Sequence, residues 1–182
     1  MRRRLSRTFP GATLKMRFWL VLLSVLLVLP GGCVYRLGGG GKGGTKRIAI
    51  PVFVNRTFEP LVDKRVTTFV QRAFVEDGRW EVVNAPGTAD LVLRGQVTGL
   101  GLTPLSFDRT GRVTEYRVQI TVDVELASPK GAAVWSGKGL TATAEYLALS
   151  DVVATRSNHD RAIEEACQRL ALDLVSRFAE GF

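Results

Sequence analysis

Residues 116–126 alternate strictly between apolar and polar side chains, and this pattern constrains the fold more than any other feature of the chain. Side chains of a β-strand point alternately to opposite faces of the sheet, so a period of two predicts a strand. One buried and one wet face is typical of an antiparallel sheet that is covered on a single side. The apolar set is Tyr116, Val118, Ile120, Val122, Val124 and Leu126, and the polar set is Arg117, Gln119, Thr121, Asp123 and Glu125.

Other strands are predicted on both sides of this segment. Pro51 suggests that the first of them lies at an edge or carries a bulge, because proline donates no hydrogen bond to a ladder. Gly95, Gly99 and Gly101 are expected on the same face of their strand as Leu93. The turns of sequence Asp-Arg-Thr-Gly and Pro-Lys-Gly join the long strands. The predicted strands are residues 48–53, 80–83, 91 to about 107, 116–126 and 134–146, with turns at 108–111 and 129–131.

Two helices complete the predicted fold. Apolar residues recur on one helical face at Val62, Val66, Phe69, Val70 and Ala73, and Gly78 ends that helix. A polar loop over 147–157 precedes the second helix, for which Ser157 or Asn158 is the predicted N-cap. Its apolar stripe is Ile163, Cys167, Leu170, Leu174 and Phe178. The sequence therefore predicts an α+β fold, a mostly antiparallel four- to five-stranded sheet with two helices packed on one face.

The N-terminus has the layout of a secretory signal. Basic residues precede Phe18–Leu29, a run of 12 residues that is apolar except for Ser24. That length fits the core of a signal peptide better than a membrane-spanning helix. We expect residues 1–32 to be removed, with Met16 as an alternative start. Residues 1–32 hold six basic and no acidic side chains, whereas 33–182 hold 19 basic and 17 acidic ones. Most of the net charge of +8 thus belongs to the N-terminal segment, and the remaining domain is not basic enough to predict a nucleic-acid partner.

Cys33 follows this segment in the sequence Leu-Pro-Gly-Gly-Cys, which resembles a bacterial lipobox. The leucine usual three places before the cysteine is replaced by Pro30, and Leu29 lies one place further back. We expect Cys33 to carry fatty acids such as palmitate, and a plain secreted protein is the alternative. Residues 33–46 form the lipidated cysteine and a Gly-rich tether, and 47–182 form one domain. Cys167 would then have no disulfide partner and is interpreted as a small buried hydrophobic residue.

No pattern in the chain indicates catalysis. His159 is the only histidine, and its expected position in the first turn of the last helix is typical of a surface or capping residue. Asp123 and Glu125 lie on the wet face of their strand, where a pair of catalytic carboxylates is only a weak alternative. We expect a binding or assembly protein, without metal or cofactor other than the covalent lipid on Cys33.

Several segments together resemble the LptE family of lipopolysaccharide-assembly lipoproteins. They are the mature start Gly32–Leu37, the run Arg47–Phe53 with Asn55–Thr57 after it, the hairpin Leu102–Arg117 and the helix Ala162–Phe182. The turn glycine followed by Glu115-Tyr116 at the head of a long strand is the most specific piece. The similarity covers nearly all of residues 30–182 and implies two helices on a four-stranded sheet.

The resemblance also implies a function. Members sit in the periplasmic side of the outer membrane, anchored by lipid, inside the β-barrel protein LptD. There they act as plug and assembly partner and help lipopolysaccharide to reach the cell surface. Arg109 matches a basic residue two before the turn glycine, and Arg156 matches one just before the last helix, both implied to bind lipopolysaccharide. Arg112 and Arg117 are added on physical grounds, because a guanidinium forms bidentate bonds to the phosphates of lipid A.

Two other function classes stay open from the sequence. The chain could instead scaffold or pilot another envelope transport machine, such as a transporter auxiliary or a secretin. A lipid-anchored periplasmic enzyme is the third class, for which a strongly perturbed acid or His159 in a deep pocket would be the sign.

Overall fold

The computed structural model describes residues 45–180. The predicted signal segment 1–32, Cys33 and the tether therefore lie outside the described residues. The strands and helices are β1 (Lys46–Ala49), β2 (Val54–Asn55), α2 (Val62–Asp77), β3 (Trp80–Val83), β4 (Leu91–Phe107), β5 (Val113–Ala127), β6 (Ala133–Leu147) and α3 (Val152–Glu180), with a 3-10 turn at Pro86–Thr88.

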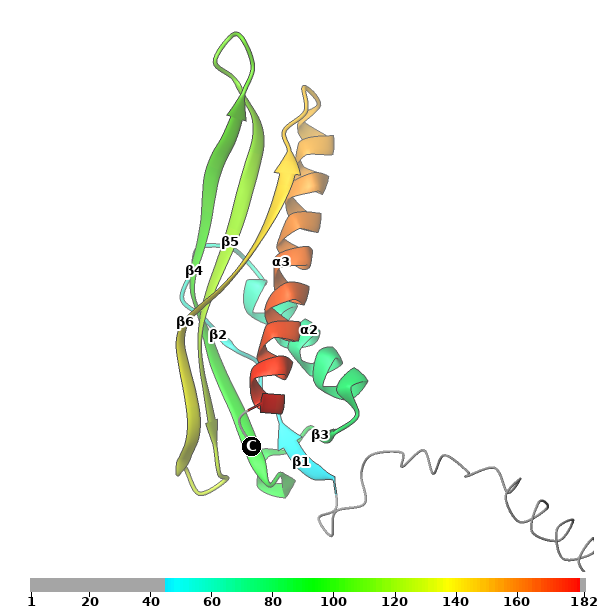
Figure 1. Cartoon of the computed structure of the whole chain (residues 1–182), viewed down its shortest axis with the longest axis vertical. Coiled ribbons are helices and arrows are strands. Elements are labelled where there is room, and N and C mark those ends of the chain that lie inside the picture. Colours follow the sequence, from blue (N-terminus) through cyan, green and yellow to red (C-terminus); the bar gives the residue numbers. More distant parts are fainter. Residues whose placement is uncertain (1–44, 181–182) are drawn as a thin grey trace, which may run out of the picture. The chain divides into compact units, whose positions relative to one another are not determined.

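The described part of the chain folds into one sheet with both helices on the same face (Figure 1). The strand order is β3-β1-β4-β5-β6, and β2 pairs with β4 beyond β1. The three long strands are antiparallel, whereas β1 runs parallel to β3 and β4. The predicted α+β class and the two helices on one face are confirmed. The sheet has six strands in place of four to five, because a short further strand, β2, follows the predicted segment 48–53 and pairs with β4.

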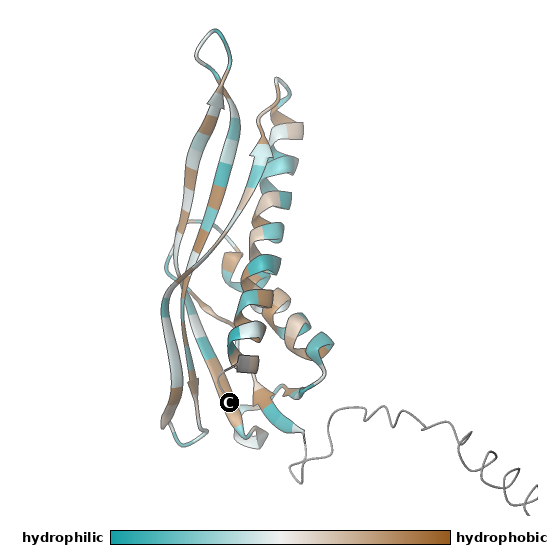
Figure 2. Ribbon diagram, viewed as in Figure 1, coloured by the Kyte–Doolittle hydropathy of each residue, from teal (hydrophilic) through white to brown (hydrophobic). Residues whose placement is uncertain are grey.

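The alternating pattern of residues 116–126 places one face of β5 in the core, as predicted. Val118, Ile120, Val122 and Leu126 are fully buried, and Val124 is nearly so. Apolar and polar bands alternate along this strand (Figure 2). The helices supply the other half of the core with Val62, Val66, Val70 and Phe74 from α2, and Ile163, Cys167, Leu170, Leu174 and Phe178 from α3. Phe69, predicted on the buried face of α2, is only half-buried.

A bulge in β4 corrects the predicted face of two glycines. Val97 pairs with Val122, but the next pair is Gly99 with Thr121, so Thr98 is an extra residue. Because side chains alternate along a strand, one inserted residue turns all later ones to the opposite face. Gly99 and Gly101 therefore lie on the outer face, away from the helices, and Leu100 takes the inner position. Gly95, before the bulge, does face inward, where the Phe53 ring occupies the space of a side chain.

The first strand is interrupted where Pro51 stands. β1 ends at Ala49, and pairing with β4 resumes only in β2 at Val54. β1 lies between β3 and β4, so the expected edge strand is wrong, and Pro51 lies in the gap between β1 and β2, not at a bulge within a strand. In β6 the ladder skips two residues between Gly137 and Leu140, and Gly139 has a φ of 63°. Gly139 therefore marks a bulge, whereas Gly137 is closely packed against the Trp135 and Leu140 side chains.

Helix α3 begins earlier than predicted. Its first residue is Val152, and Asp151 Oδ1 accepts hydrogen bonds from the N–H groups of Val153 (2.8 Å) and Ala154 (3.4 Å). Asp151 is thus the N-cap, and Ser157 and Asn158, predicted for that role, lie within the helix. The predicted apolar stripe of α3 is buried. Cys167 is fully buried, and burial raises the pKa of its thiol to about 12, which confirms the interpretation of an inert core residue.

Candidate functional site at the hairpin end of the sheet

The turn between β4 and β5 is organised by Asp108. Its Oδ1 accepts hydrogen bonds from the Thr110 N–H (2.8 Å), the Thr110 hydroxyl (2.7 Å) and the Arg112 N–H (3.0 Å). These bonds hold the pKa of the Asp108 carboxyl below its ordinary value. Gly111 supplies the left-handed conformation, with a φ of 81°. The turn is therefore fixed without any contribution from the side chain of Arg109.

Arg109 and Arg112 project from this turn into solvent. Both are exposed, and no ion pair within residues 45–180 involves either guanidinium. Two neighbouring positive charges attract an anion more strongly than one isolated charge does. Because the backbone of the turn is already ordered, binding an anion there costs little conformational entropy. The structure thus brings these two of the four predicted arginines together and leaves both able to bind an anion.

Arg117 lies elsewhere and is engaged. Its guanidinium donates to Glu145 Oε1 of β6 at 2.7 Å across the outer face of the sheet. Both side chains are about half exposed, so the pair contributes little to stability. It nevertheless neutralises the charge of Arg117. Of the four arginines, this one is the least suited to bind an anionic ligand.

Arg156 lies within α3, one turn after the N-cap, which corrects its predicted place before the helix. Its side chain is 70% exposed and lies 3.7 Å from Asp160 at the next turn. The loop that leads into α3 meets the base of the hairpin, because the Ala148 N–H donates to the Thr114 carbonyl (3.0 Å). Arg156 and the hairpin arginines therefore lie at the same end of the sheet (Figure 1).

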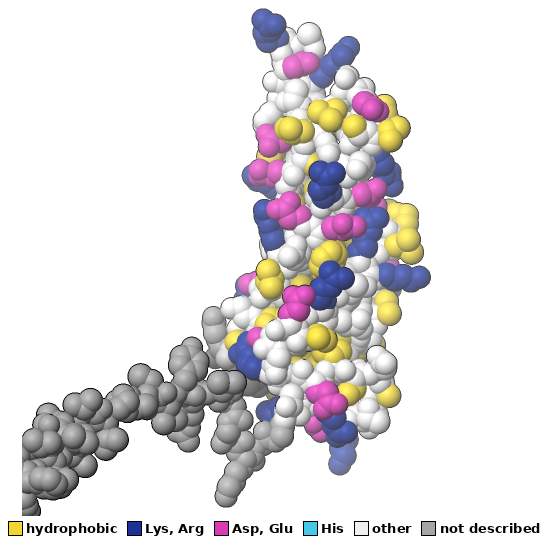
Figure 3. Space-filling view, turned by 90° about the vertical axis from the view of Figure 1, so that its right-hand side faces the viewer, with side chains coloured by type: hydrophobic (Ala, Val, Ile, Leu, Met, Phe, Trp, Pro, Cys, Tyr) yellow, Lys and Arg dark blue, Asp and Glu magenta, His cyan; other side chains and the backbone are white. Residues whose placement is uncertain are grey.

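Apolar side chains are exposed at this same end, a feature that sequence reasoning missed. Basic side chains project at the top of the space-filling view, with apolar ones just below them (Figure 3). In the sequence, apolar residues stand at Ala148-Leu149 and Val152-Val153, but these positions were predicted to belong to a polar loop. The exposed apolar residues of the hairpin end are Phe107 (61%), Leu147 (58%), Leu149 (51%), Val152 (79%) and Val153 (77%).

His159 lies beneath this end, between α3 and β6. Its ring meets the Tyr146 ring edge-on at 5.4 Å, and Tyr146 stacks on Tyr116 at 5.4 Å. The side chain is only 12% exposed, and its Nδ1 has no hydrogen-bond partner in the part of the chain that the structure describes. His159 is therefore a packed ring in the eighth position of α3. The predicted surface or capping role in the first turn is wrong, because the helix starts seven residues earlier.

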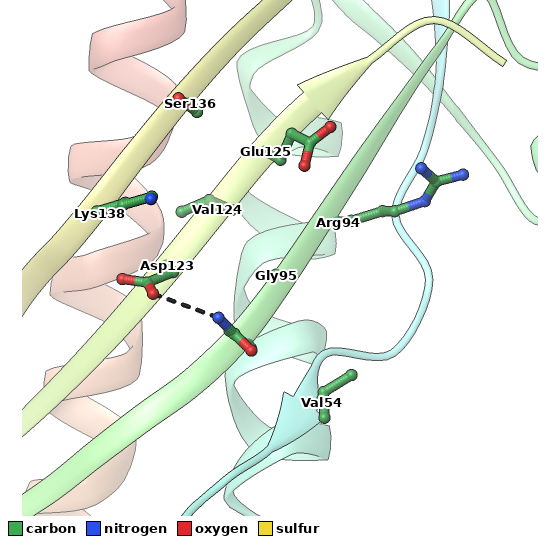
Figure 4. Close-up of a pocket in the computed structure, with 9 residues that line it drawn as sticks. Val54, Arg94, Gly95, Asp123, Val124, Glu125, Ser136 and Lys138 are labelled. Atoms are coloured by element: carbon green, nitrogen blue, oxygen red, sulfur yellow. Dashed lines mark hydrogen bonds between the residues drawn. The ribbon is translucent and has the colours of Figure 1, made fainter. Parts of the chain in front are cut away.

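A hollow of about 260 Å³ on the outer face of the sheet holds the two acids considered for catalysis (Figure 4). Asp123 accepts hydrogen bonds from the Gln96 side chain (3.3 Å) and from the Gly139 N–H (2.8 Å). The second bond fixes the bulge of β6, so Asp123 has a structural role. Glu125 and Arg94 lie on neighbouring strands of this hollow, which is open and of mixed charge.

Residues 45–180 contain no group of three or more His, Cys, Asp or Glu side chains placed to hold a metal ion. None of the helices described there is both long and apolar enough to cross a membrane.

Solved structures share this fold. One is the rare lipoprotein B of Shewanella oneidensis, with 19% identity, a TM-score of 0.52 and coverage of 74% of this chain and 94% of that one. A hypothetical protein from Chlamydia trachomatis has 11% identity, a TM-score of 0.52 and coverages of 75% and 97%. Lipoprotein B of Nitrosomonas europaea has 16% identity, a TM-score of 0.50 and coverages of 79% and 94%. These structures show that the chain shares their α+β fold.

A family comparison is more specific than these structures. The lipopolysaccharide-assembly family LptE matches residues 45–178, which is most of the described chain. No curated protein matches in a direct sequence search. The chain belongs to the LptE family.

Proposed function

We propose that this lipoprotein plugs and helps to assemble the outer-membrane β-barrel LptD, and that it assists the transfer of lipopolysaccharide to the cell surface. Membership of the LptE family supports a role in lipopolysaccharide assembly. The proposal assigns it no catalysis and no cofactor. It places the domain on the periplasmic side of the outer membrane, where its partners are the barrel and the glycolipid.

The observation that carries this proposal is the combination of charges and apolar surface at the hairpin end. Lipopolysaccharide presents phosphates next to acyl chains. Arg109, Arg112 and Arg156 offer guanidinium groups for the phosphates, while Phe107 and Val153 lie exposed close to the same turns. An isolated exposed apolar side chain is ordinary, but a cluster rimmed by charges marks an interaction site. An amphiphilic anion fits this surface better than a purely polar ligand does.

The proposed anchor is the lipid on Cys33. Several acyl chains hold a protein on a bilayer stably, whereas one holds it weakly. The tether between Arg36 and Lys46 has 11 residues, seven of which form the run GGGGKGG. A tether of this length would keep the folded domain close to its own membrane.

Isolation of the tagged full-length protein in mild detergent tests this function. We expect it to co-purify with one large outer-membrane β-barrel protein and with lipopolysaccharide. The Cys33→Ala variant is expected to lose fatty-acid labelling, to leave the membrane fraction and to yield much less of the barrel complex. Recovery of an inner-membrane ATPase or a secretin ring would overturn the proposal in favour of another envelope machine. Equal labelling of both proteins would contradict the anchor.

A further inference from the structure

The C-terminal half of β4, beyond Val97, is unpaired on the side away from β5, and we call this side the open edge. On the side away from β5, this strand pairs with β1 at Leu91 and Val92 and with β2 at Gln96 and Val97. Beyond Val97 no strand within residues 45–180 pairs with it on that side, and Figure 1 shows nothing beside it there. An uncovered edge presents a row of N–H and C=O groups that can pair with another chain.

Pro104 shows which backbone groups face this open edge. Proline has no N–H, so in a paired strand it occupies a position whose backbone points away from the neighbouring strand. The register with β5 is continuous from Gly99 to Pro104. Since backbone orientation alternates along a strand, Leu100 and Leu102 share the orientation of Pro104. The N–H and C=O groups of both leucines therefore point to the open side.

The opposite edge of the sheet, formed by β6, is covered by helix α3. On β6 the Thr143 carbonyl accepts a hydrogen bond from Arg169 of α3 (2.7 Å), and the Leu147 carbonyl accepts one from Asn158 (3.0 Å). Proteins also protect an edge with charged side chains. No charged residue occurs between Arg94 and Asp108, so only the bulge at Thr98 and Pro104 protect this edge, at the two ends of its open part.

A rigid loop beside the lower end of this edge presents an aromatic side chain. Phe58 is fully exposed. Asn55 and Thr57 fix the loop: Asn55 Oδ1 accepts from the Thr57 N–H (2.8 Å), and the Asn55 amide donates to the Glu59 carbonyl (2.8 Å). Phe58 and the residues around it form, with Thr98, Gly99 and Leu100, a hollow of about 340 Å³. Aromatic side chains, phenylalanine among them, are enriched in protein interfaces relative to the rest of the surface.

The same loop excludes a second copy of this chain as the occupant. The Arg56 N–H donates to the Val97 carbonyl (2.9 Å), so the loop closes the lower end of the open edge. A second β4, pairing antiparallel, would continue into its own hairpin and collide with this loop. A linear segment of about five residues fits between the loop and Pro104.

We propose that the open edge of β4 binds an extended, uncharged segment of a partner protein by strand addition. The Gly99 and Gly101 positions on the outer face leave room for aromatic side chains of the added strand, since cross-strand aromatic rings cover glycine well. Phe58 packs against the end of that strand. This inference rests on the proposed function in one respect, that the outer-membrane barrel is the protein that supplies the segment.

The test uses the full-length lipoprotein in cells, with the photocrosslinking residue benzoylphenylalanine in place of Phe58. We expect a crosslink to one protein, within a segment of extended sequence. Leu102→Pro removes an N–H that faces the open edge and leaves the β5 ladder intact, so it should lower the crosslinked product about tenfold. Leu102→Val keeps that N–H and should crosslink as the parent does. Thermal melting of the three proteins should agree, which separates loss of binding from loss of folding.

The outcomes separate this inference from the proposed function. A Leu102→Pro-sensitive crosslink to a protein that is not an outer-membrane barrel would overturn the proposed function and support strand addition. An unchanged crosslink in the folded Leu102→Pro variant would overturn strand addition, as would the absence of any crosslink at Phe58.

Discussion

Replacement of Ile120 by alanine is expected to lower the free energy of unfolding by about 2–5 kcal/mol. Ile120 is fully buried in the middle of β5, and it pairs with Leu100 on one side and Ala142 on the other. Removing its side chain leaves a cavity between the sheet and the helices, in a place where the three long strands limit collapse. Urea unfolding of the mature chain without its lipid measures the loss.

Thr121→Ala is the matched control for this change. Thr121 is the next residue of the same strand, and its side chain lies on the outer face, half exposed. Its loss should cost about 0.5 kcal/mol or less. Equal costs for the two substitutions would mean that the helices cover the other face of β5, and the fold described above would be wrong.

Arg109→Glu is expected to weaken lipopolysaccharide binding by more than the about one to two orders of magnitude that follow from loss of a single charge-assisted hydrogen bond. A charge-assisted hydrogen bond is worth about 1.5–3 kcal/mol, and reversal of the charge adds repulsion. Arg109→Ala should weaken binding less, and Arg109→Lys should restore only part, because an ammonium is not bidentate. Titration of the purified protein with labelled lipopolysaccharide measures the affinities. All three variants should melt like the parent, because the turn depends on Asp108 and Gly111.

Lys130→Glu provides the control at the opposite end of the sheet. Lys130 stands in the β5–β6 turn, where Gly131 has a φ of 91° and the Gly131 N–H donates to the Ser128 carbonyl (2.8 Å). It is exposed in a turn of the same kind, so its replacement reverses one charge at the other end of the sheet. An equal loss of affinity for both variants would indicate a general effect of net charge, and Arg109 would then have no special role.

The elements that could be predicted from the sequence are those with a clear periodic pattern of apolar side chains. A period of two in β5 and an apolar stripe in α3 each require a single buried face, so these faces could be predicted without any structure. The bulge at Thr98 could not be predicted. The alternation of side chains along β4 is too weak to show that one residue has been inserted. The start of α3 was missed because Val152 and Val153 are exposed, so they carry no helical period of burial.

The candidate site was predicted in part. The turn signal Asp-Arg-Thr-Gly placed Arg109 and Arg112 at a tip, and the structure agrees. The pairing of Arg117 with Glu145 depends on the β5–β6 register, which the bulge at Lys138 and Gly139 shifts. No local pattern encodes that register. Two of the exposed apolar side chains beside the arginines, Val152 and Val153, lie at the start of α3, and they were missed because the start of that helix was missed.

The most direct test of the central claim is a crosslink between lipopolysaccharide and the hairpin end. Benzoylphenylalanine replaces Phe107, which is 61% exposed at the end of β4, in cells that synthesise and export lipopolysaccharide. The same residue in place of Lys130 reports on the opposite turn. We expect a glycolipid crosslink from position 107 and none from position 130. The absence of glycolipid at position 107, in a protein that is folded and reaches the membrane, would contradict the account, as would equal crosslinking from both ends.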